Sequence, residues 1–177
     1  MKKIAILFLV LSMIFCASCV KNDDVAQFQG SISETTPEVV TPEEAVITLY
    51  YSDNQAMYLE KEERTVSGKD AADPGFVLGE LFKGPENSEL INVLPPDIKL
   101  NSCTTEDRVC IIDLSKEFNE IQGSAAQQMA LYSVVNTLCS VEGVDKVRIL
   151  IDGEVNPPNC VFDFSEDIMA DMSIVNE

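Results

Sequence analysis

The side chains that perform most protein chemistry are unevenly represented in this sequence of 177 residues. It contains no histidine, thirty acidic residues and six cysteines. Without an imidazole, neither a Ser-His-Asp triad nor a Cys-His pair can form, and the usual nitrogen ligand of zinc and iron is missing. The glycines are scattered and form no phosphate-binding loop. The chemistry left to consider therefore belongs to carboxylates and thiols.

Four carboxylates are candidates for an acid–base pair of the kind used in glycoside hydrolysis: Asp113 and Glu117 with Asp152 or Glu154. Such coincidences are common in an acidic chain, and solvated loops and strand ends also explain all four. The segment 163–167 alternates oxygen-bearing side chains, as calcium ligands do, but lacks the glycine and distal glutamate of a full calcium loop. We therefore predict a protein that is not an enzyme and has no metal or cofactor.

Four cysteines lie beyond the amino-terminal segment: Cys103, Cys110, Cys139 and Cys160. Their spacing lacks the close pairs of a zinc site. A hairpin turn centred on Glu106 and Asp107 would place Cys103 directly opposite Cys110, so we expect a disulfide between them. Two small buried thiols are the alternative. A second bridge between the other two cysteines cannot be judged from the sequence.

Two further sets of residues have both a functional and a structural interpretation. The first set is aromatic and would line a sugar-binding groove or pack in the core: Tyr50, Tyr51, Tyr58, Phe76 and Phe82. The second set is mostly small and would admit a close neighbour: Ala125, Ala126, Ala130 and Tyr132. That neighbour is either the protein's own sheet or another subunit.

The best-specified elements lie in the second half of the chain. Ser124 and Gln127 match the Ser-x-x-Gln capping box, which predicts the start of a helix. Four apolar residues then recur at helical spacing and predict its buried stripe: Leu131, Val134, Val135 and Leu138. Gly143 predicts a turn, and the alternation over 147–151 predicts a strand that returns along the helix.

The upstream pattern supplies the other elements. Alternating apolar residues predict a strand over 45–51, and a more polar strand is expected over 57–66, where the charges suit a half-exposed or edge position. Asp73 followed by Pro74 predicts the start of a helix. A hairpin is expected over 98–115. The order β-β-α-β-β-α-β predicts an α+β fold, a two-layer module with two helices packed on one face of a small mixed sheet.

Several runs within this order resemble a known family. The second half of a GerMN domain, the sporulation and spore germination domain, is similar to SAAQQMALYSVVNTLCSVEGVDKVRILIDGE. The first helix and hairpin of that domain are similar to LGELFKGPENSELINVLPPDIKLNSC and RVCIIDLSKEF. The likeness covers about residues 46–154. It implies a compact module related to ring-building folds and used in membrane-tethered assemblies, and it implies no reaction.

The amino-terminal residues predict export and a lipid anchor. Lys2 and Lys3 precede a short apolar run and small residues, which is the pattern of a signal peptide over 1–18. The run CASC, ending at Cys19, resembles a lipobox, so we expect Cys19 to be lipid-modified. Cys16 is the poorer site because a large phenylalanine precedes it. Ordinary cleavage or an uncleaved anchor is the alternative.

The rest of the chain divides by composition. We expect residues 19–44 to combine the lipidated cysteine with a disordered acidic tether rich in serine, threonine and proline, which would span on the order of 28 Å. We expect residues 45–165 to form the GerMN-like domain and residues 166–177 to form a carboxyl-terminal tail. The net charge of −18 repels phosphate backbones, so nucleic acid is not an expected partner.

Together these features predict an extracytoplasmic lipoprotein anchored to the bacterial cell membrane. We expect a non-catalytic structural or interaction module, serving a sporulation or germination assembly as the resemblance implies. Its expected partners are the membrane, through the lipid, and other envelope proteins. The resemblance to ring-building folds adds self-association. The alternative is an extracytoplasmic ligand-binding lipoprotein that captures a cation, a peptide or a glycan.

Overall fold

The computed structural model describes residues 43–158, 160 and 162–176, and these contain five strands. The strands are β1 (Glu44–Ser52), β2 (Leu59–Ser67), β3 (Leu100–Glu106), β4 (Val109–Leu114) and β5 (Lys146–Ile151). The α-helices are α1 (Gly68–Ala71), α2 (Pro74–Phe82) and α3 (Ser124–Cys139), and the short 3-10 helices are η1 (Lys116–Glu120) and η2 (Met172–Ile174). The predicted α+β class and the order of the main elements are confirmed.

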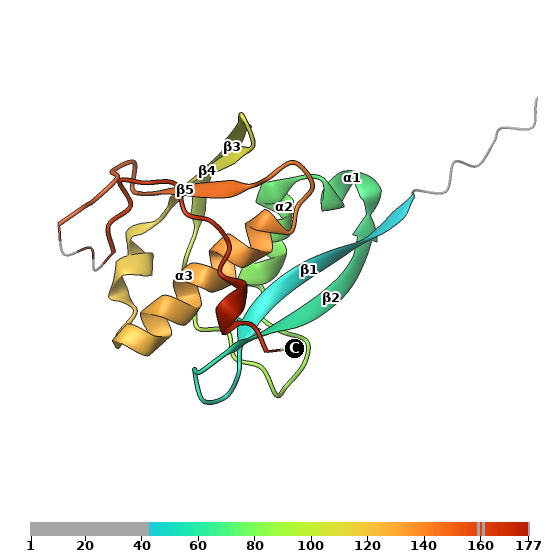
Figure 1. Ribbon diagram of the computed structural model, residues 1–177, viewed down its shortest axis with the longest axis horizontal. Helices are drawn as coiled ribbons and strands as arrows, with labels where there is room; N and C mark the ends of the chain where they lie inside the picture. Colours follow the sequence, from blue (N-terminus) through green and yellow to red (C-terminus); the bar gives the residue numbers. More distant parts are fainter. Residues whose placement is uncertain (1–42, 159, 161, 177) are drawn as a thin grey trace, which may run out of the picture. The chain divides into compact units, whose positions relative to one another are not determined.

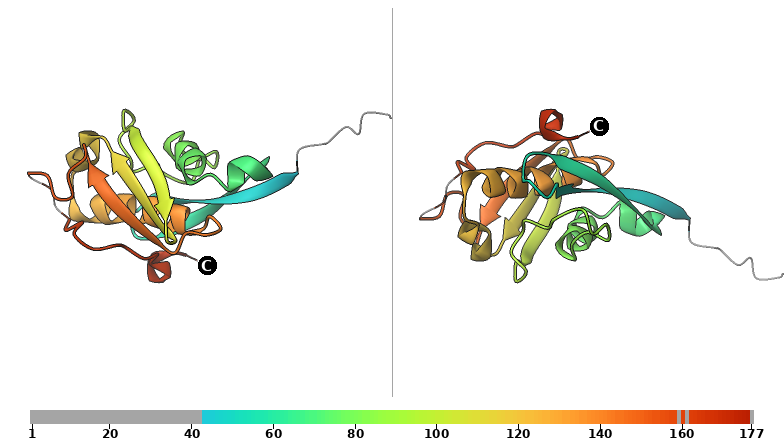
Figure 2. Two further views of the ribbon diagram at one scale, coloured as in Figure 1. Left: turned by 90° about the horizontal axis from the view of Figure 1, so that it is seen from above. Right: turned by 90° about the horizontal axis from the view of Figure 1, so that it is seen from below.

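The strands divide into two sheets instead of the single mixed sheet that we expected. β1 and β2 form an antiparallel pair, while β3, β4 and β5 form a sheet in that order, with β3 antiparallel and β5 parallel to β4. Helix α3 contacts β1 on one side and β5 on the other, so it lies between the two sheets (Figures 1 and 2). This position explains why eight of the nine residues from 130 to 138 are buried.

Hydroxyl groups of α3 and of Ser140, the residue that follows it, occupy the free edge of β1. Thr137 Oγ1 accepts a hydrogen bond from the backbone N–H of Tyr50 at 3.0 Å, and Ser133 Oγ donates to the carbonyl of Tyr50. Ser140 Oγ donates to the carbonyl of Thr48 at 3.0 Å. Because buried backbone groups must be paired, these side chains replace the strand that would otherwise add to this edge.

Helix α2 begins as its sequence predicts. The carboxylate of Asp73 accepts hydrogen bonds from the N–H groups of Gly75 and Phe76, at 2.9 and 3.3 Å, and Pro74 occupies the first helical position. The helix ends before Gly84, whose φ of +87° is the left-handed conformation that terminates helices. The buried face of α2 is Val77, Leu78 and Leu81.

Helix α3 begins where we predicted, but the capping box that we expected at its start is not formed. The residue before the helix is Gly123, with φ of +91°, and the side chain of Ser124 makes no capping bond. Gln127 donates through Nε2 to the carbonyl of Ile121 at 2.7 Å instead of reaching back to the cap. The helix therefore begins at Ser124 because the chain turns at a glycine, and the capping box does not form.

The β3–β4 hairpin is shifted by one residue from the predicted register. The turn is formed by Asp107 and Arg108, which have φ of +48° and +66°, the pattern of a type I′ turn. Val109 is therefore paired with Glu106, Thr105 with Cys110, and Cys103 with Ile112. Cys103 and Cys110 are diagonal neighbours on one face of the hairpin, and the directly opposed pair that we predicted is wrong.

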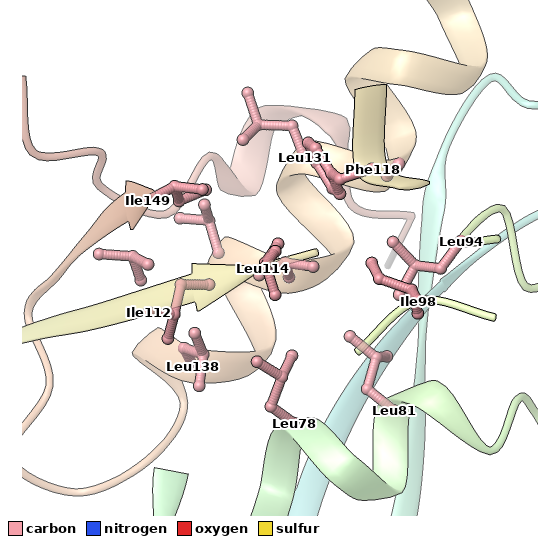
Figure 3. Packing of buried hydrophobic residues seen from close by; sticks show 14 of the residues in the cluster. Leu78, Leu81, Leu94, Ile98, Ile112, Leu114, Phe118, Leu131, Leu138 and Ile149 are labelled. Atoms are coloured by element: carbon pink, nitrogen blue, oxygen red, sulfur yellow. The ribbon is translucent and has the colours of Figure 1, made fainter. Parts of the chain in front are cut away.

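A single apolar core joins the two sheets and both larger helices. The predicted stripe of α3 is buried in it, as are the alternate residues Val147, Ile149 and Ile151 of β5. Figure 3 shows side chains of α2, α3 and the three-stranded sheet pointing toward one another. A smaller cluster forms on the other side of β1: Tyr50, Leu59 and Met129.

The segment expected to be a tail binds along the domain. Ile168 exchanges two backbone hydrogen bonds of 2.8 Å with Val147 on β5. The amide of the buried Asn136 on α3 donates to the carbonyl of Asp171 and accepts from its N–H, each at 2.9 Å. Farther on, Asn176 donates to the carbonyl of Leu59 on β2 at 2.8 Å. This segment thus connects the outer edges of both sheets.

Candidate functional site

The candidate site is a groove around η1, at the edge of the sheet where two parallel strands end. Leu114 and Ile151 are paired at the ends of β4 and β5, and the N–H of Asp152 donates to the carbonyl of Leu114. Open α/β sheets bind ligands in the crevice beyond the carboxyl ends of their strands. Two hollows of about 430 Å³ each adjoin here, and both are lined by Glu120. We call this pair of hollows the η1 groove.

The lining of the η1 groove combines apolar surface with acidic groups. Its apolar residues include Ile121 and Ile151, and proline pairs at residues 95–96 and 157–158. Its charged residues are Asp97, Lys116, Glu120, Asp152 and Glu154. With four carboxylates and one ammonium group, all on exposed residues, the groove has a net negative charge. Its chemistry suits a ligand that combines apolar groups with positive charge.

The four carboxylates that were candidates for acid–base chemistry differ in what they contact. Asp152 and Glu154 line the η1 groove. Asp113 accepts a hydrogen bond from the N–H of Gly153 at 2.9 Å, so it holds the turn after β5. A hydrogen bond from Ser115 and one from the backbone lower the pKa of Glu117, which does not line the groove. The geometry therefore gives these carboxylates structural and surface roles.

The side chains of the candidate calcium segment are engaged within the protein. Asp163 Oδ1 accepts from Asn156 Nδ2 at 2.9 Å and from the N–H of Ser165 at 3.0 Å. Hydrogen bonds from Ser165 and Asn156 lower the pKa of Asp163 to about 2. Asp167 forms an ion pair with Arg148 at 2.7 Å. Within the described residues, no three acidic, cysteine or histidine side chains gather as a metal site would require.

The aromatic set and the small-residue set, each with a functional and a structural interpretation, lie mainly in or against the core. Tyr51 is buried in the main core and Tyr50 in the smaller cluster, so they do not line a common sugar-binding surface. Tyr58 is exposed. In the small-residue set, Ala130 is fully buried against the protein's own core, whereas Ala126 lines the η1 groove.

Sequence inspection missed a buried polar cluster centred on Arg64. The guanidinium group, on a side chain that is 8% exposed, donates to Glu62 Oε1 from two nitrogens at 3.0 and 2.6 Å. It also donates to the carbonyl of Glu80 at 3.0 Å and to the hydroxyl of Tyr51 at 3.2 Å. The charges along β2 predicted a half-exposed or edge strand, and nothing among them distinguished Arg64 from its neighbours. We call these residues the Arg64 cluster.

The remaining predicted site residues are the cysteines. Cys103 is partly exposed, Cys110 is fully buried, and their sulfur atoms lie 3.6 Å apart as free thiols. The thiol of Cys139 donates to the carbonyl of Asp145. The lipidation site predicted at Cys19, the signal peptide and most of the tether lie outside the described residues. Over the part of the chain that is described, no helix has the length and apolar character to cross a membrane.

One sequence family matches most of this domain. The profile of the Germane family, described as sporulation and spore germination, matches residues 48–156. This range extends from within β1 to a point beyond β5. None of the curated proteins matches the chain.

Solved structures resemble the same region. The tandem GerMN domains of the sporulation protein GerM from Bacillus subtilis are 24% identical to this chain, with a TM-score of 0.58. The match covers 76% of this chain and 47% of the tandem structure. The first GerMN domain of GerM alone is 22% identical with a TM-score of 0.52, covering 71% and 97%. A candidate lipoprotein from Clostridium perfringens is 27% identical with a TM-score of 0.48, covering 72% and 88%. The chain thus spans about half of the tandem structure and shares the fold of the GerM domains.

Proposed function

Because the chain belongs to the Germane family of sporulation and spore germination domains, we propose that it is a lipid-anchored envelope protein that binds another protein of such an assembly. The observation that carries the proposal is the extent of the family match, which includes both sheets and the two longer helices. The role is that of an interaction module without catalysis. The sequence supports this role because it offers no histidine for general acid–base or nucleophilic chemistry.

The anchor is the second part of the proposal. A charged start, a short apolar run and Cys19 support a signal peptide followed by lipidation, and the acidic tether would hold the domain clear of the lipid surface. The protein would then lie outside the cytoplasmic membrane, where its partners are other envelope proteins. Self-association is a further outcome to be tested, since a second copy can also be the partner.

The η1 groove is the surface that we assign to this partner. Its prolines and buried isoleucines offer an apolar floor, and its rim carries Glu120, Asp152 and Glu154. An extended segment with basic and apolar residues complements both features, since opposite charges speed association and apolar contact provides affinity. The overall charge of −18 favours the same kind of partner.

Cross-linking from a single position in the living cell tests the assignment. A photo-reactive amino acid replaces Glu120 in the full chain, and a matched chain has it at Glu63, an exposed residue of β2. We expect the first chain to capture an envelope protein through a peptide rich in lysine or arginine, and the second chain to capture none of it. Equal capture from both positions, or no protein adduct from Glu120, would contradict the groove as the binding surface.

The second candidate function is capture of a small cation, peptide or glycan. The position of the groove beyond the ends of β4 and β5 favours it, because ligands bind at this place in many sheets. A small molecule that co-purifies with the chain, without any protein adduct from Glu120, would support this function over the first. A cell-wall hydrolysis activity lost in Asp152→Asn or Asp113→Asn, with the fold intact, would show instead that the protein is an enzyme.

A further inference from the structure

Two thiols on one face of the β3–β4 hairpin are in direct contact. The sulfur atoms of Cys103 and Cys110 are 3.6 Å apart. The register pairs Cys110 with Thr105, and Cys103 lies two residues before Thr105 on β3, on the same face. The thiols are therefore diagonal neighbours, and the geometry of their approach differs from that of an opposed pair.

A disulfide at a diagonal position is at the limit of what backbone geometry allows. Diagonal residues of an antiparallel pair are typically about 7–8 Å apart, whereas bridged cysteines have Cα atoms about 4.4–6.8 Å apart. Closing the bond must bring the two sulfurs from 3.6 Å to about 2.05 Å, with β3 drawn toward β4. Bonds that require such adjustment are more easily reduced than relaxed structural disulfides.

The surroundings of the two thiols are unequal. Cys110 is fully buried within the core, while Cys103 is partly exposed beside the first turn of α2. A side-chain carbon added to Gly75 would lie 3.6 Å from Cβ of Cys103, which shows how closely that turn approaches. Only Cys103 is open to a reagent in solvent, so an external disulfide must react there first.

Ionisation follows the same asymmetry. A hydrogen bond from the Cys110 thiol lowers the pKa of Cys103, against burial and the negative charge of Asp73, which both raise it. The same hydrogen bond, together with burial, raises the pKa of Cys110. Thr105, whose hydrogen bond lowers the pKa of Cys110, and Cys139, whose charge raises it, also face this pair. The thiolate that attacks external disulfides is therefore Cys103.

We propose that Cys103 and Cys110 form a reversible dithiol–disulfide site, in which Cys103 exchanges with an external disulfide and Cys110 resolves the product. The external reagent is a thiol–disulfide oxidoreductase of the cell envelope, or oxidised glutathione in vitro. The site goes beyond the binding function proposed above and does not depend on it.

The reaction balances in two steps. The Cys103 thiolate attacks one sulfur of the reagent's disulfide, forming a mixed disulfide and releasing one thiolate. The Cys110 sulfur, after losing its proton, then attacks the Cys103 sulfur, forms the hairpin bond and releases the second thiolate. The cysteines lose two electrons and two protons, and the reagent gains them as two thiols.

Equilibration of the full chain in mixtures of reduced and oxidised glutathione tests the proposal. After alkylation of free thiols, intact mass and peptide mapping report the bond between Cys103 and Cys110. We expect the bond to form with excess oxidised glutathione and to open again with excess reduced glutathione. Thiols that stay alkylatable throughout would overturn the site, and a bond that resists excess reduced glutathione would overturn its reversibility.

Single substitutions test the separate roles. Cys110→Ala should leave Cys103 trapped as a mixed disulfide with glutathione, whereas Cys103→Ser should leave Cys110 unmodified because it is buried. Cys110→Ser is a second variant in case the alanine chain does not fold. Cys160→Ser removes another partly exposed thiol that is no part of this hairpin, so it is the matched control and should leave the equilibrium of the pair unchanged. Modification of Cys110 in the Cys103→Ser chain, at the rate seen for Cys103, would refute the assigned order of attack.

Discussion

The Arg64 cluster provides the most demanding test of how this domain is held together. Replacement of Arg64 by methionine keeps the apolar stem of the side chain and removes the guanidinium group. The change leaves Glu62, on a side chain that is only 10% exposed, without its cationic partner. It also removes the donors for the carbonyl groups of Glu80 and Gly84 at the end of α2. One substitution therefore removes the hydrogen bonds by which Arg64 connects β2 to the end of α2.

The loss of unfolding free energy expected for Arg64→Met depends on the hydrogen bonds that Glu62 keeps. Removing one partner of a buried, hydrogen-bonded ion pair typically costs about 3–5 kcal/mol of unfolding free energy, because the other charge stays buried. Glu62 keeps two backbone donors, the N–H groups of Glu86 and Asn87, each at 2.9 Å. We therefore expect a loss near the lower end, about 3 kcal/mol, which for a domain of this size lowers the melting temperature by roughly 10 °C.

Urea unfolding of the purified chains, monitored by circular dichroism, measures this loss. The matched control is Arg148→Met, on β5, where the arginine is 46% exposed and pairs with Asp167 at the surface. We expect no measurable change in that variant, because exposed ion pairs contribute little to stability. The two arginines both lie on strands and both pair with acidic side chains, so the comparison sets a buried, multiply hydrogen-bonded arginine against an exposed one.

A double-mutant cycle then shows whether charge is the cause. Glu62→Gln combined with Arg64→Met should cost about 1–3 kcal/mol less than the sum of the single effects, because glutamine leaves no unpaired charge. Two results would refute the reasoning. One is an Arg64→Met chain as stable as the Arg148→Met chain, and the other is strict additivity of the Glu62 and Arg64 effects.

Three further predictions concern β1, the pH dependence of the Arg64 cluster and the lipid anchor. Thr137→Val leaves the buried N–H of Tyr50 without an acceptor and should cost about 1–3 kcal/mol in urea unfolding, whereas Thr104→Val, at an exposed site on β3, should cost nothing measurable. Burial raises the pKa of Glu62, but hydrogen bonds from the N–H of Asn87 and from Arg64 outweigh it, so the folded pKa lies below the ordinary value of 4.5. The ionised Glu62 carboxylate therefore stabilises the fold above pH 4.5, and this contribution is lost as the pH falls through the folded pKa. A Glu62→Gln chain should lose unfolding free energy less steeply below pH 4.5 than the parent chain. Parallel plots of unfolding free energy against pH for the two chains would contradict the assignment to Glu62. Cys19→Ala should block lipidation and leave precursor, or protein shed into the medium, whereas Cys16→Ala should not; the reverse outcome would move the anchor to Cys16.

Local patterns in the sequence predicted helices and strands correctly where residues close together in the chain determine the structure. Asp73 and Pro74 start α2 as expected, because the carboxylate and the first two free N–H groups lie within one turn. The alternation around Ile149 gives the buried face of β5 for the same reason, since side chains alternate along any strand.

The prediction was wrong where two local solutions differ little in energy. A hairpin turn at residues 106–107 or at 107–108 satisfies the same alternation on β4, so the register depended on which pair tolerates positive φ. Ser124 and Gln127 fit a capping box, yet Gln127 bonds to Ile121 because the preceding loop brings that carbonyl within reach.

Polar contacts between residues far apart in the chain produce no recognisable sequence pattern. The hydroxyls of Ser133 and Thr137 resemble ordinary helix residues until β1 is placed beside them, and Arg64 resembles any charge on an edge strand. The η1 groove likewise joins residues 94–97 to residues 151–158, which only the folded chain brings together. Partners separated by many residues are set by packing, and a single sequence does not reveal them.

The path of residues 168–176 also determines when the domain can be completed during synthesis. This segment follows all five strands and α3 in the chain, yet it supplies the hydrogen bonds at Val147 on β5 and at Leu59 on β2. A nascent chain that has reached only residue 160 therefore has both sheets but an open edge on each. Such edges are the surfaces through which strands pair with other chains. A chain released early by truncation would keep them open permanently, so it should aggregate even though all five strands and α3 are present.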